Sequence, residues 1–183
     1  MLVKRIWLII GFMLFAHQGG AQSMLIDDFS PNSNGQWSYF ADTVMGGVSN
    51  GSARIVQTDI GPAAYLYGRV STANNGGFIQ IRTSFSGKTA QNAKGLRLRV
   101  KGNGETYYIH LRTSGSYLPW QYYSAGFPTT SEWTEVWLPF DSFVSSGRGM
   151  RKSLRPRSIS SLGVVAYGKD HRADLWVEEI SLY

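Results

Sequence analysis

The sequence predicts an all-β fold, a jelly-roll β-sandwich of two antiparallel sheets. Three observations lead to this prediction. Short stretches of alternating apolar and polar residues recur along the chain, and Gly, Asn, Ser or Pro bounds them. No convincing helical periodicity is found after residue 25. The chain has 21 Gly and 14% aromatic residues but only 16% charged residues, a composition typical of turn-rich β-proteins.

The expected strands follow one another in short alternating stretches. They comprise residues 25–29, 53–56, 64–70, 96–101, 107–112, 120–124, 134–138, 162–167 and 175–182. Nine short strands without intervening helices favour a sandwich or jelly roll over a parallel sheet flanked by helices.

The most regular alternation lies in residues 96–101 and 107–112. One face of each stretch is apolar and is expected to face the core: Leu96, Leu98 and Val100 in the first, and Tyr107, Ile109 and Leu111 in the second. Gly102-Asn103-Gly104 separates the two stretches, a sequence typical of tight turns. We therefore expect these two strands to form a hairpin.

Residues 1–21 have the pattern of a secretory signal peptide. Lys4 and Arg5 precede an uncharged apolar stretch at 6–16, and small residues precede a cleavage point before Gln22. This stretch is shorter than the roughly 20 residues that span a bilayer. We expect cleavage and export to a periplasmic or secreted location, with a membrane anchor from an uncleaved signal as the alternative.

Residues 22–183 are expected to form a single domain. A chain of this size buries roughly two thirds of the surface that it exposes when unfolded, so it needs no cross-links. It contains no Cys, which excludes disulfides, thiolate metal sites, iron–sulfur clusters and a cysteine nucleophile.

Gly47-Val48-Ser49-Asn50-Gly51 matches the G-x-S-x-G pattern of a hydrolase nucleophile. That mechanism needs a strand before the Ser and a helix after it, whereas a strand is expected to follow here. His110 and His171 are the only histidines beyond the signal segment, and Asp170-His171 lies downstream in the required order. We interpret Ser49 as a turn residue and expect no catalytic residues and no enzymatic activity.

The 12 carboxylates are scattered along the chain. Asp27 or Asp28 with Asp174 or Glu178 would offer hard oxygen ligands to a structural Ca²⁺ where the terminal strands meet, but solvated acids are the simpler interpretation. We expect no metal and no cofactor.

One strand face combines aromatic and polar side chains. The candidate binding face consists of Tyr108, His110, Arg112, Trp120 and Tyr122. Exposed aromatic rings beside Arg and His are what a sugar-binding sandwich uses, through ring stacking and hydrogen bonds. Core packing is the alternative for each ring.

A long polar loop is expected at 145–157. It carries the candidate docking residues Arg148, Arg151, Lys152, Arg155 and Arg157, and no acidic residue lies between Ser142 and Lys169. Such a loop suits an acidic protein or an anionic membrane surface, and a solvated basic loop is the alternative. Export argues against nucleic acid as a partner.

Two further motifs carry a resemblance to a known family. They comprise Trp37, Asp42, Met45, Gly46, Gly47 and Ser49 in the first, and Asn74, Asn75, Gly76, Gly77 and Phe78 in the second. With Arg148-Gly149 and the closing Ile180-Ser181-Leu182, they make residues 24–183 resemble the complex I intermediate-associated protein 30 family. The resemblance implies a galactose-binding-like jelly roll related to carbohydrate-binding modules, and a role in assembling NADH:ubiquinone oxidoreductase (complex I) without enzymatic activity.

The motif residues also have a physical interpretation. The glycine pairs supply positive φ angles or close backbone approach at two turns. Asp42, Asn74 and Asn75 can accept bonds from turn amides, and Trp37 and Phe78 are expected to anchor the core. A structural role and a binding role for these motifs both remain open.

We therefore expect a non-catalytic exported module that binds another protein, as assembly or chaperone-like factors do. A carbohydrate-binding module is the alternative. Protein binding predicts an apolar or basic patch at loops, whereas glycan binding predicts exposed aromatic side chains along one sheet face. The oligomeric state is not predicted.

Overall fold

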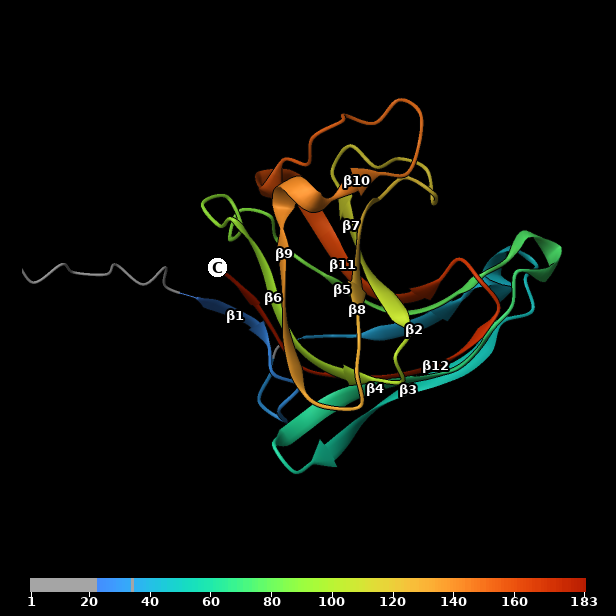
Figure 1. Cartoon of the computed structure of the whole chain (residues 1–183). Helices are drawn as coiled ribbons and strands as arrows, with labels where there is room; N and C mark the ends of the chain where they lie inside the picture. The colour runs from blue at the N-terminus through green and yellow to red at the C-terminus, as the bar shows by residue number, and fades with distance from the viewer. Residues whose placement is uncertain (1–22, 34) are drawn as a thin grey trace, which may run out of the picture.

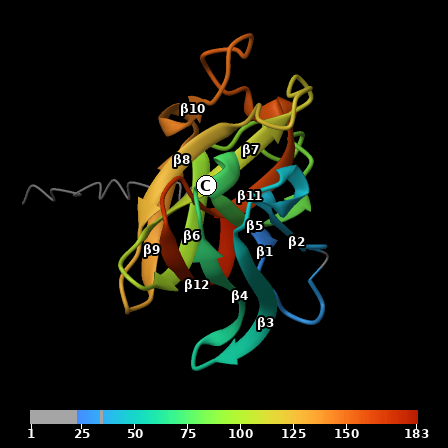
Figure 2. The same cartoon turned by 90° about the vertical axis from the view of Figure 1, so that its right-hand side faces the viewer.

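The computed structural model describes residues 23–33 and 35–183, and it is an all-β sandwich of two six-stranded antiparallel sheets (Figures 1 and 2). Sheet A contains β1 (Met24–Asp27), β3 (Asn50–Thr58), β4 (Gly61–Val70), β6 (Gly95–Gly102), β9 (Thr134–Pro139) and β12 (His171–Leu182). Sheet B contains β2 (Ser38–Ala41), β5 (Phe78–Ser84), β7 (Thr106–Thr113), β8 (Tyr123–Pro128), β10 (Val144–Ser145) and β11 (Ile159–Tyr167). The predicted fold class is confirmed.

The strand order is β3-β4-β12-β6-β9 in sheet A and β10-β8-β7-β11-β5-β2 in sheet B. The long β12 is the centre of sheet A, because it pairs with β6 along one edge and with both β4 and β1 along the other. The short 3-10 helices of the described residues are η1 (Asp42–Met45), η2 (Ala73–Asn75), η3 (Phe140–Ser142) and η4 (Pro156–Ser158).

The core lies between the sheets and follows the predicted alternation. Leu96, Leu98 and Val100 of β6 are buried, and so are Tyr107, Ile109 and Leu111 of β7. Their burial removes apolar surface from water, which is the main favourable contribution to folding.

The predicted hairpin between these two strands is wrong. β6 belongs to sheet A and β7 to sheet B, so the two strands face each other across the core. The connection at 103–105 crosses between the sheets, and Asn103 bonds the Arg172 carbonyl through Nδ2 at 2.8 Å. A hairpin within one sheet and an arch between two sheets give the same sequence pattern. In both, the two strands alternate, a Gly/Asn connection joins them, and one face of each strand lies in the core.

Three strands were not predicted. β2 and β10 have only four and two residues, and β5 (FIQIRTS) follows directly on the glycine motif. Trp120, expected at the start of a strand, lies in the loop before β8 and is 60% exposed. The other expected strands are present with boundaries shifted by a few residues.

Two of the long loops lie together at one end of the sandwich. The loops around residues 114–122 and 146–155 lie at the top of Figure 1, and the turn of the β3–β4 hairpin lies at the bottom of Figure 2. No helix in the described part of the chain is long and apolar enough to cross a membrane. The expected signal peptide at 1–21 lies outside the described residues.

Candidate binding surfaces

Asp42 is a buried carboxylate at the start of η1 that accepts four hydrogen bonds. The Ser49 N–H lies 3.0 Å from one oxygen, and the other oxygen accepts bonds from Ser49 Oγ and from the N–H groups of Gly77 (2.5 Å) and Phe78 (3.2 Å). Burial alone would raise the pKa of Asp42, but these hydrogen bonds outweigh it and hold the pKa below its ordinary value. Asp42 thus ties together the two motifs noted in the sequence.

The motif glycines leave room for this carboxylate. A Cβ on Gly47 would lie 2.3 Å from Asp42 Cγ, and a Cβ on Gly76 would lie 2.4 Å from Oδ2. Their neighbours Gly46 and Gly77 have φ angles of +87° and +126°, a region that favours glycine. The glycine pairs are therefore needed for the packing around Asp42.

The other motif residues differ in what they contact. Asn74 has a φ of +58° and donates through Nδ2 to the Gly46 carbonyl at 3.3 Å, and Asn75 has the same φ. Trp37 is partly buried against the core, as expected. Phe78 alternates with the buried Ile79, so it lies on the outer side of sheet B and not in the core.

Asp27 holds Trp37 in place. Asp27 is buried, and its two oxygens accept bonds from Phe29 N (2.7 Å) and Trp37 Nε1 (2.8 Å). The rings of Phe29 and Trp37 lie 5.4 Å apart. Asp27 therefore has a structural role, and no group of three or more His, Asp or Glu side chains suited to a metal ion occurs in the described chain.

The first surface of interest is the tip formed by η1 and the turn after it. Val44, Met45 and Val48 are 71%, 58% and 51% exposed. We call these three residues the motif ledge. Asp42 fixes the backbone of this segment, so the apolar side chains of the motif ledge are exposed to solvent on a well-ordered backbone.

The second surface is the outer face of sheet B, which we call the aromatic face. Tyr108, His110 and Arg112 alternate outward along β7, as predicted. The Tyr122 ring stacks on His110, with centroids 3.9 Å apart and planes 14° from parallel. Tyr167 of β11 lies against both His110 and Tyr108, at 5.5 and 5.9 Å between centroids.

His110 is largely enclosed in this face. Burial lowers the pKa of His110 to about 3, and its Nε2 is buried without a hydrogen-bond partner in the described chain. Burial also raises the pKa of Tyr122, and a hydrogen bond with Tyr167 adds to this shift. The face is therefore neutral at its centre over the physiological range of pH.

Cations flank this face. Arg112 donates to the carbonyls of Pro119 (2.9 Å) and Ser116 (2.8 Å), so it fixes the loop that carries Trp120. Arg82 of β5 lies over the Phe40 ring at 4.4 Å.

Sequence reasoning missed Tyr167, Arg82 and Phe40 on this face. They come from β11, β5 and β2, which join β7 in one sheet only in the folded protein. The alternation of β11 and β5 would have placed Tyr167 and Arg82 on an outer face, but not on the same sheet as His110.

The third surface is the end of the molecule where the basic loop lies. Arg148, Arg151, Lys152, Arg155 and Arg157 are all exposed, and none of them is in the ion pairs of the described chain. Ser146 joins this loop to the neighbouring one, since its Oγ donates to the Trp120 carbonyl at 2.6 Å. Tyr117 and Trp120 of that loop are 84% and 60% exposed, so apolar and basic side chains share this end.

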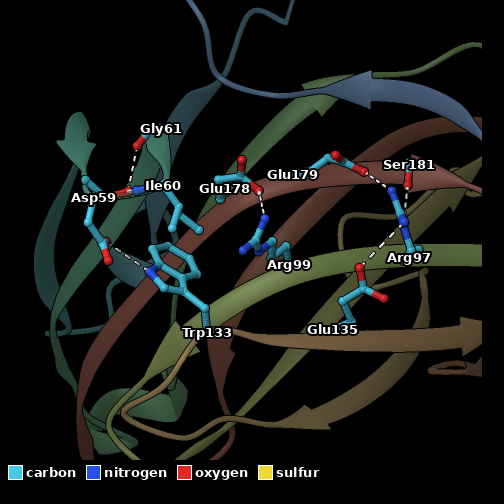
Figure 3. A network of polar contacts seen from close by, with 11 residues as sticks. Asp59, Ile60, Gly61, Arg97, Arg99, Trp133, Glu135, Glu178, Glu179 and Ser181 are labelled. Atoms are coloured by element: carbon cyan, nitrogen blue, oxygen red, sulfur yellow. Dashed lines mark hydrogen bonds and ion pairs between the residues drawn. The ribbon is translucent and has the colours of Figure 1, made fainter.

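Several charged side chains on the outer face of sheet A form ion pairs. Arg97 bonds Glu179 and Ser181 and lies 3.6 Å from Glu135, and Arg99 lies 4.0 Å from Glu178 (Figure 3). Arg97 and Arg99 alternate along β6 with the core residues Leu96, Leu98 and Val100, so they lie on the outer face.

Ser49 is not arranged as a nucleophile. It is 1% exposed, and its hydroxyl is engaged by Asp42 and by the backbone of Ser71, whose N–H donates to Oγ at 2.9 Å. A strand, β3, follows it in place of a helix. Asp170 accepts bonds from Thr72, both at 2.7 Å, and orients no histidine toward Ser49.

Several solved structures share this fold. The family 11 carbohydrate-binding module of cellulosomal cellulase Lic26A-Cel5E of Clostridium thermocellum superposes with a TM-score of 0.70 at 18% identity, over 87% of this chain and 93% of that one. The Clostridium thermocellum module in complex with a β-1,3-1,4-mixed-linked tetrasaccharide gives the same TM-score and identity over 87% and 94%. The family 30 module of cellulase Cel9D-Cel44B of this organism gives 0.59 at 14% identity, over 88% and 96%.

The sequence itself was compared with protein families. No curated protein matches it. The sequence model named "Complex I intermediate-associated protein 30 (CIA30)" matches residues 27–176, which is most of the chain. The chain therefore belongs to the complex I intermediate-associated protein 30 family, and its galactose-binding-like β-sandwich is the fold of carbohydrate-binding modules.

Proposed function

We propose that this chain is a non-catalytic binding module that holds a protein partner at the motif ledge, in the manner of an assembly factor. The observation that carries the proposal is the exposure of Val44, Met45 and Val48. Apolar side chains that are held together in solvent typically mark a contact surface for another molecule. Membership in a family named for complex I intermediates favours a protein as that molecule.

Rigidity supports this assignment. The four hydrogen bonds to Asp42 and the bond from Asn74 to the Gly46 carbonyl fix η1 before any partner arrives. A surface that is already ordered loses less conformational entropy on binding. The ledge is thus suited to an apolar segment or patch of a partner, including an incompletely assembled subunit.

The location of this activity is part of the proposal. We infer that residues 1–21 direct export, so the module meets its partner outside the cytoplasm. A subunit or intermediate of NADH:ubiquinone oxidoreductase is the partner that the family name favours.

Photo-crosslinking in the producing cells tests the proposal. A photoreactive amino acid in place of Met45 should capture one protein repeatedly, whereas the same amino acid in place of Lys88, beyond the far end of β5, should not. The combined variant Val44→Ser, Met45→Ser and Val48→Ser should lose this partner by at least tenfold in pull-down. Its melting temperature should stay nearly unchanged, because exposed side chains contribute little to stability.

Two results would contradict the proposal. One is equal capture from positions 45 and 88, and the other is full retention of the partner by the triple variant. Deleting the gene tests whether the partner belongs to NADH:ubiquinone oxidoreductase. If it does, a native gel of the deletion strain should show less of the assembled complex.

A glycan-binding role is the second candidate, and the aromatic face favours it. Tyr122 and Tyr167 offer ring surfaces beside Arg82 and Arg112, a combination suited to sugar rings. Affinity electrophoresis in a soluble mixed-linked β-glucan gel should retard the protein, and Tyr167→Ala should abolish the retardation. Migration unchanged by the glucan would remove this candidate.

A further inference from the structure

β3 forms an open edge of sheet A (Figure 2). It pairs with β4 on one side in a continuous antiparallel register, and no strand of the described chain pairs with its other side. The strands at the other ends of the two sheets are shorter than the nine residues of β3: β2 and β10 have four and two residues, and β9 has six and ends in Pro139. A long edge strand without Pro or a bulge is a template for pairing with another strand.

The backbone of alternate β3 residues points to this open side. Gln57 lies opposite Pro62, which has no N–H, so the backbone groups of Gln57 face away from β4. Because the orientation alternates along an antiparallel strand, those of Ala53 and Ile55 face away as well. None of the turn, loop or side-chain hydrogen bonds in the described chain uses the backbone of these three residues. Their N–H and C=O groups are therefore available to an added strand.

The core side of this edge is apolar. Ile55 lies opposite the core residue Ala64, so its side chain is on the core side, yet it is 52% exposed. Together with Ala53 it borders a pocket of about 390 Å³ whose lining includes Phe29 and Trp37. An apolar side chain of an added strand would lie beside Ile55 and this pocket.

The outer side of the edge is cationic. Arg54 is exposed there, and its guanidinium lies over the rings of Tyr65 and Tyr67, 5.8 and 5.6 Å from their centroids. It takes part in none of the ion pairs found among the described residues. Two copies of β3 paired about their centre would set their Arg54 side chains opposite or diagonal to each other, which like charges disfavour. An acidic segment of another protein is the better match.

The open edge is continuous with the motif ledge. Val48 lies two residues before β3 begins, a distance of at most about 7 Å along the chain. The segment with Val44 and Met45, η1, connects β2 at the end of sheet B to β3 at the end of sheet A. A protein that contacts the ledge therefore lies beside the start of the open edge.

We propose that β3 receives an extended acidic segment of a partner protein as an added strand of sheet A. The proposal rests on the proposed function, since the partner is the protein held at the motif ledge. The segment pairs through its backbone with Ala53, Ile55 and Gln57, and its side chains alternate between the two faces. Its apolar side chains lie on the core side beside Ile55, and its acidic side chains lie on the outer side beside Arg54.

Hydrogen exchange followed by NMR tests the edge before any ligand is added. The amides of Ala53, Ile55 and Gln57 should exchange about tenfold or more faster than those of Arg54 and Val56, which face β4. Equal protection of the two sets would show that the edge is already paired and would overturn the proposal.

The probe for binding is a phage-displayed library of peptides of about nine residues, the length of β3, selected on the purified protein. Selected peptides should alternate acidic and apolar residues, and they should slow exchange of the open-edge amides about tenfold or more. Only every second N–H of an added strand faces β3. N-methylation of one alternate set of peptide residues should therefore abolish binding, whereas N-methylation of the other set should not.

Variants locate the site. Ile55→Pro removes an N–H on the open side and keeps the ladder to β4, so it should weaken peptide binding about tenfold or more. Glu135→Pro is the matched control, because Glu135 has the orientation of Pro139 in β9 and its N–H faces away from β6. Arg54→Gln should weaken binding severalfold, and the difference from the wild type should shrink in high salt.

Thermal unfolding first shows that each variant is folded, and Arg54→Gln keeps the test valid if Ile55→Pro is not. The proposal is overturned if the library yields no binder, if binders leave the open-edge amides unprotected, or if folded Ile55→Pro and Arg54→Gln bind as the wild type does. A concentration-dependent dimer that protects the same amides and is lost in Ile55→Pro would overturn it too, and would assign the edge to a second copy.

Failure of this proposal is distinguishable from failure of the proposed function. Crosslinking from position 45 reports on the ledge alone, and a short peptide binds β3 without the ledge. The combined Ser variant of Val44, Met45 and Val48 should therefore bind the selected peptides as the wild type does.

Discussion

Asp42 joins segments that are far apart in the sequence, and its side chain is the best-connected polar group around the motifs. Asp42→Asn replaces one acceptor oxygen by an NH₂ group that faces N–H donors. We expect a loss of about 2–4 kcal/mol in the free energy of unfolding, because buried donors are left unpaired. Urea denaturation measures it, with Asp141→Asn as a control that should stay within about 0.5 kcal/mol.

The effect should depend on pH in a defined direction. The pKa of Asp42 is lower in the folded protein than in the unfolded chain, so its contribution is fully present above the unfolded value of about 4. It is lost as the pH falls through the folded pKa. The stability difference between wild type and Asp42→Asn should therefore shrink in acid, and a difference that grows in acid would contradict the assignment.

His110 gives a second prediction of how stability depends on pH. Here burial, and not hydrogen bonding, lowers the pKa in the folded protein. The unfolded chain binds a proton at this ring near pH 6.5, whereas the folded protein does so only near pH 3. Between these values the unfolded state holds more protons, so this site lowers stability as the pH falls, by at most about 1.4 kcal/mol per pH unit. His110→Phe keeps an aromatic ring against Tyr122 and cannot titrate.

Melting temperatures measured from about pH 7 to about pH 5 check this prediction, because the loss of stability caused by His110 begins within that interval. The wild type should lose more than His110→Phe on acidification. Parallel curves for the two proteins would show that His110 is more accessible to water than its burial in the aromatic face implies.

Single residues show where sequence reasoning reaches its limit. The glycine pairs and Asp42 were recognised as turn-forming, because residue type alone restricts backbone conformation. That all of them surround one carboxylate was not predictable, since Gly76 and Gly77 approach Asp42 only after β5 is in place. Phe78 was wrongly expected in the core for a similar reason, because the side of the sheet that it occupies depends on the register of β5.

At the scale of elements, the basic loop and its neighbour form one end of the sandwich. Arg151, Lys152 and Arg155 are exposed, and the exposed Tyr117 and Trp120 lie beside them. Interfacial aromatic residues combined with cations are typical of proteins that contact anionic lipid headgroups. We expect this end to bind phosphatidylglycerol vesicles at low salt, with little binding to phosphatidylcholine.

Replacing Arg151, Lys152 and Arg155 with Ser should reduce vesicle binding severalfold and leave the melting temperature nearly unchanged. High salt should reduce wild-type binding too, since the Debye length falls from about 10 Å at 0.1 M to about 3 Å at 1 M. The combined Ser variant of Arg54, Arg99 and Lys101, on the outer face of sheet A, is the control of equal charge. Sedimentation with vesicles distinguishes a docking loop from a merely solvated one, for which both variants bind alike.

The arch between β6 and β7 shows why elements were easier to predict than their pairing. Each strand was found from its own alternation, which depends only on neighbouring residues. Its partner depends on contacts such as Asn103 to Arg172 and Gly102 to Thr130, which join segments distant in the sequence. The short β2 and β10 had too few residues to show a period.

At the scale of the whole molecule, the fold class followed from composition and periodicity, because a two-layer sandwich is the common way to bury many one-sided strands. The arrangement of surfaces did not follow. The aromatic face needs β5, β7 and β11 side by side, and the open edge of sheet A needs β3 at the end of the strand order. Both depend on how distant segments pair, so only part of each site could be named from the sequence.

The same topology makes the C-terminal residues contribute far more to stability than the N-terminal residues do. β12 pairs with β1, β4 and β6, and Ile180 and Leu182 near its end are 0% and 2% exposed. β1 lies at the edge, and its Met24 and Leu25 are about half exposed.

A chain that ends at residue 179 loses two core side chains and the partner of β1. This loss should cost about 5 kcal/mol or more, close to the whole stability of a typical domain. A chain that begins at Ile26 should lose only about 1 kcal/mol. Urea denaturation followed by tryptophan fluorescence and circular dichroism should find the first variant largely unfolded without urea and the second close to the wild type. Equal midpoints for both truncations would contradict the central place of β12, because only a strand that joins several others can make one end so much more costly to remove.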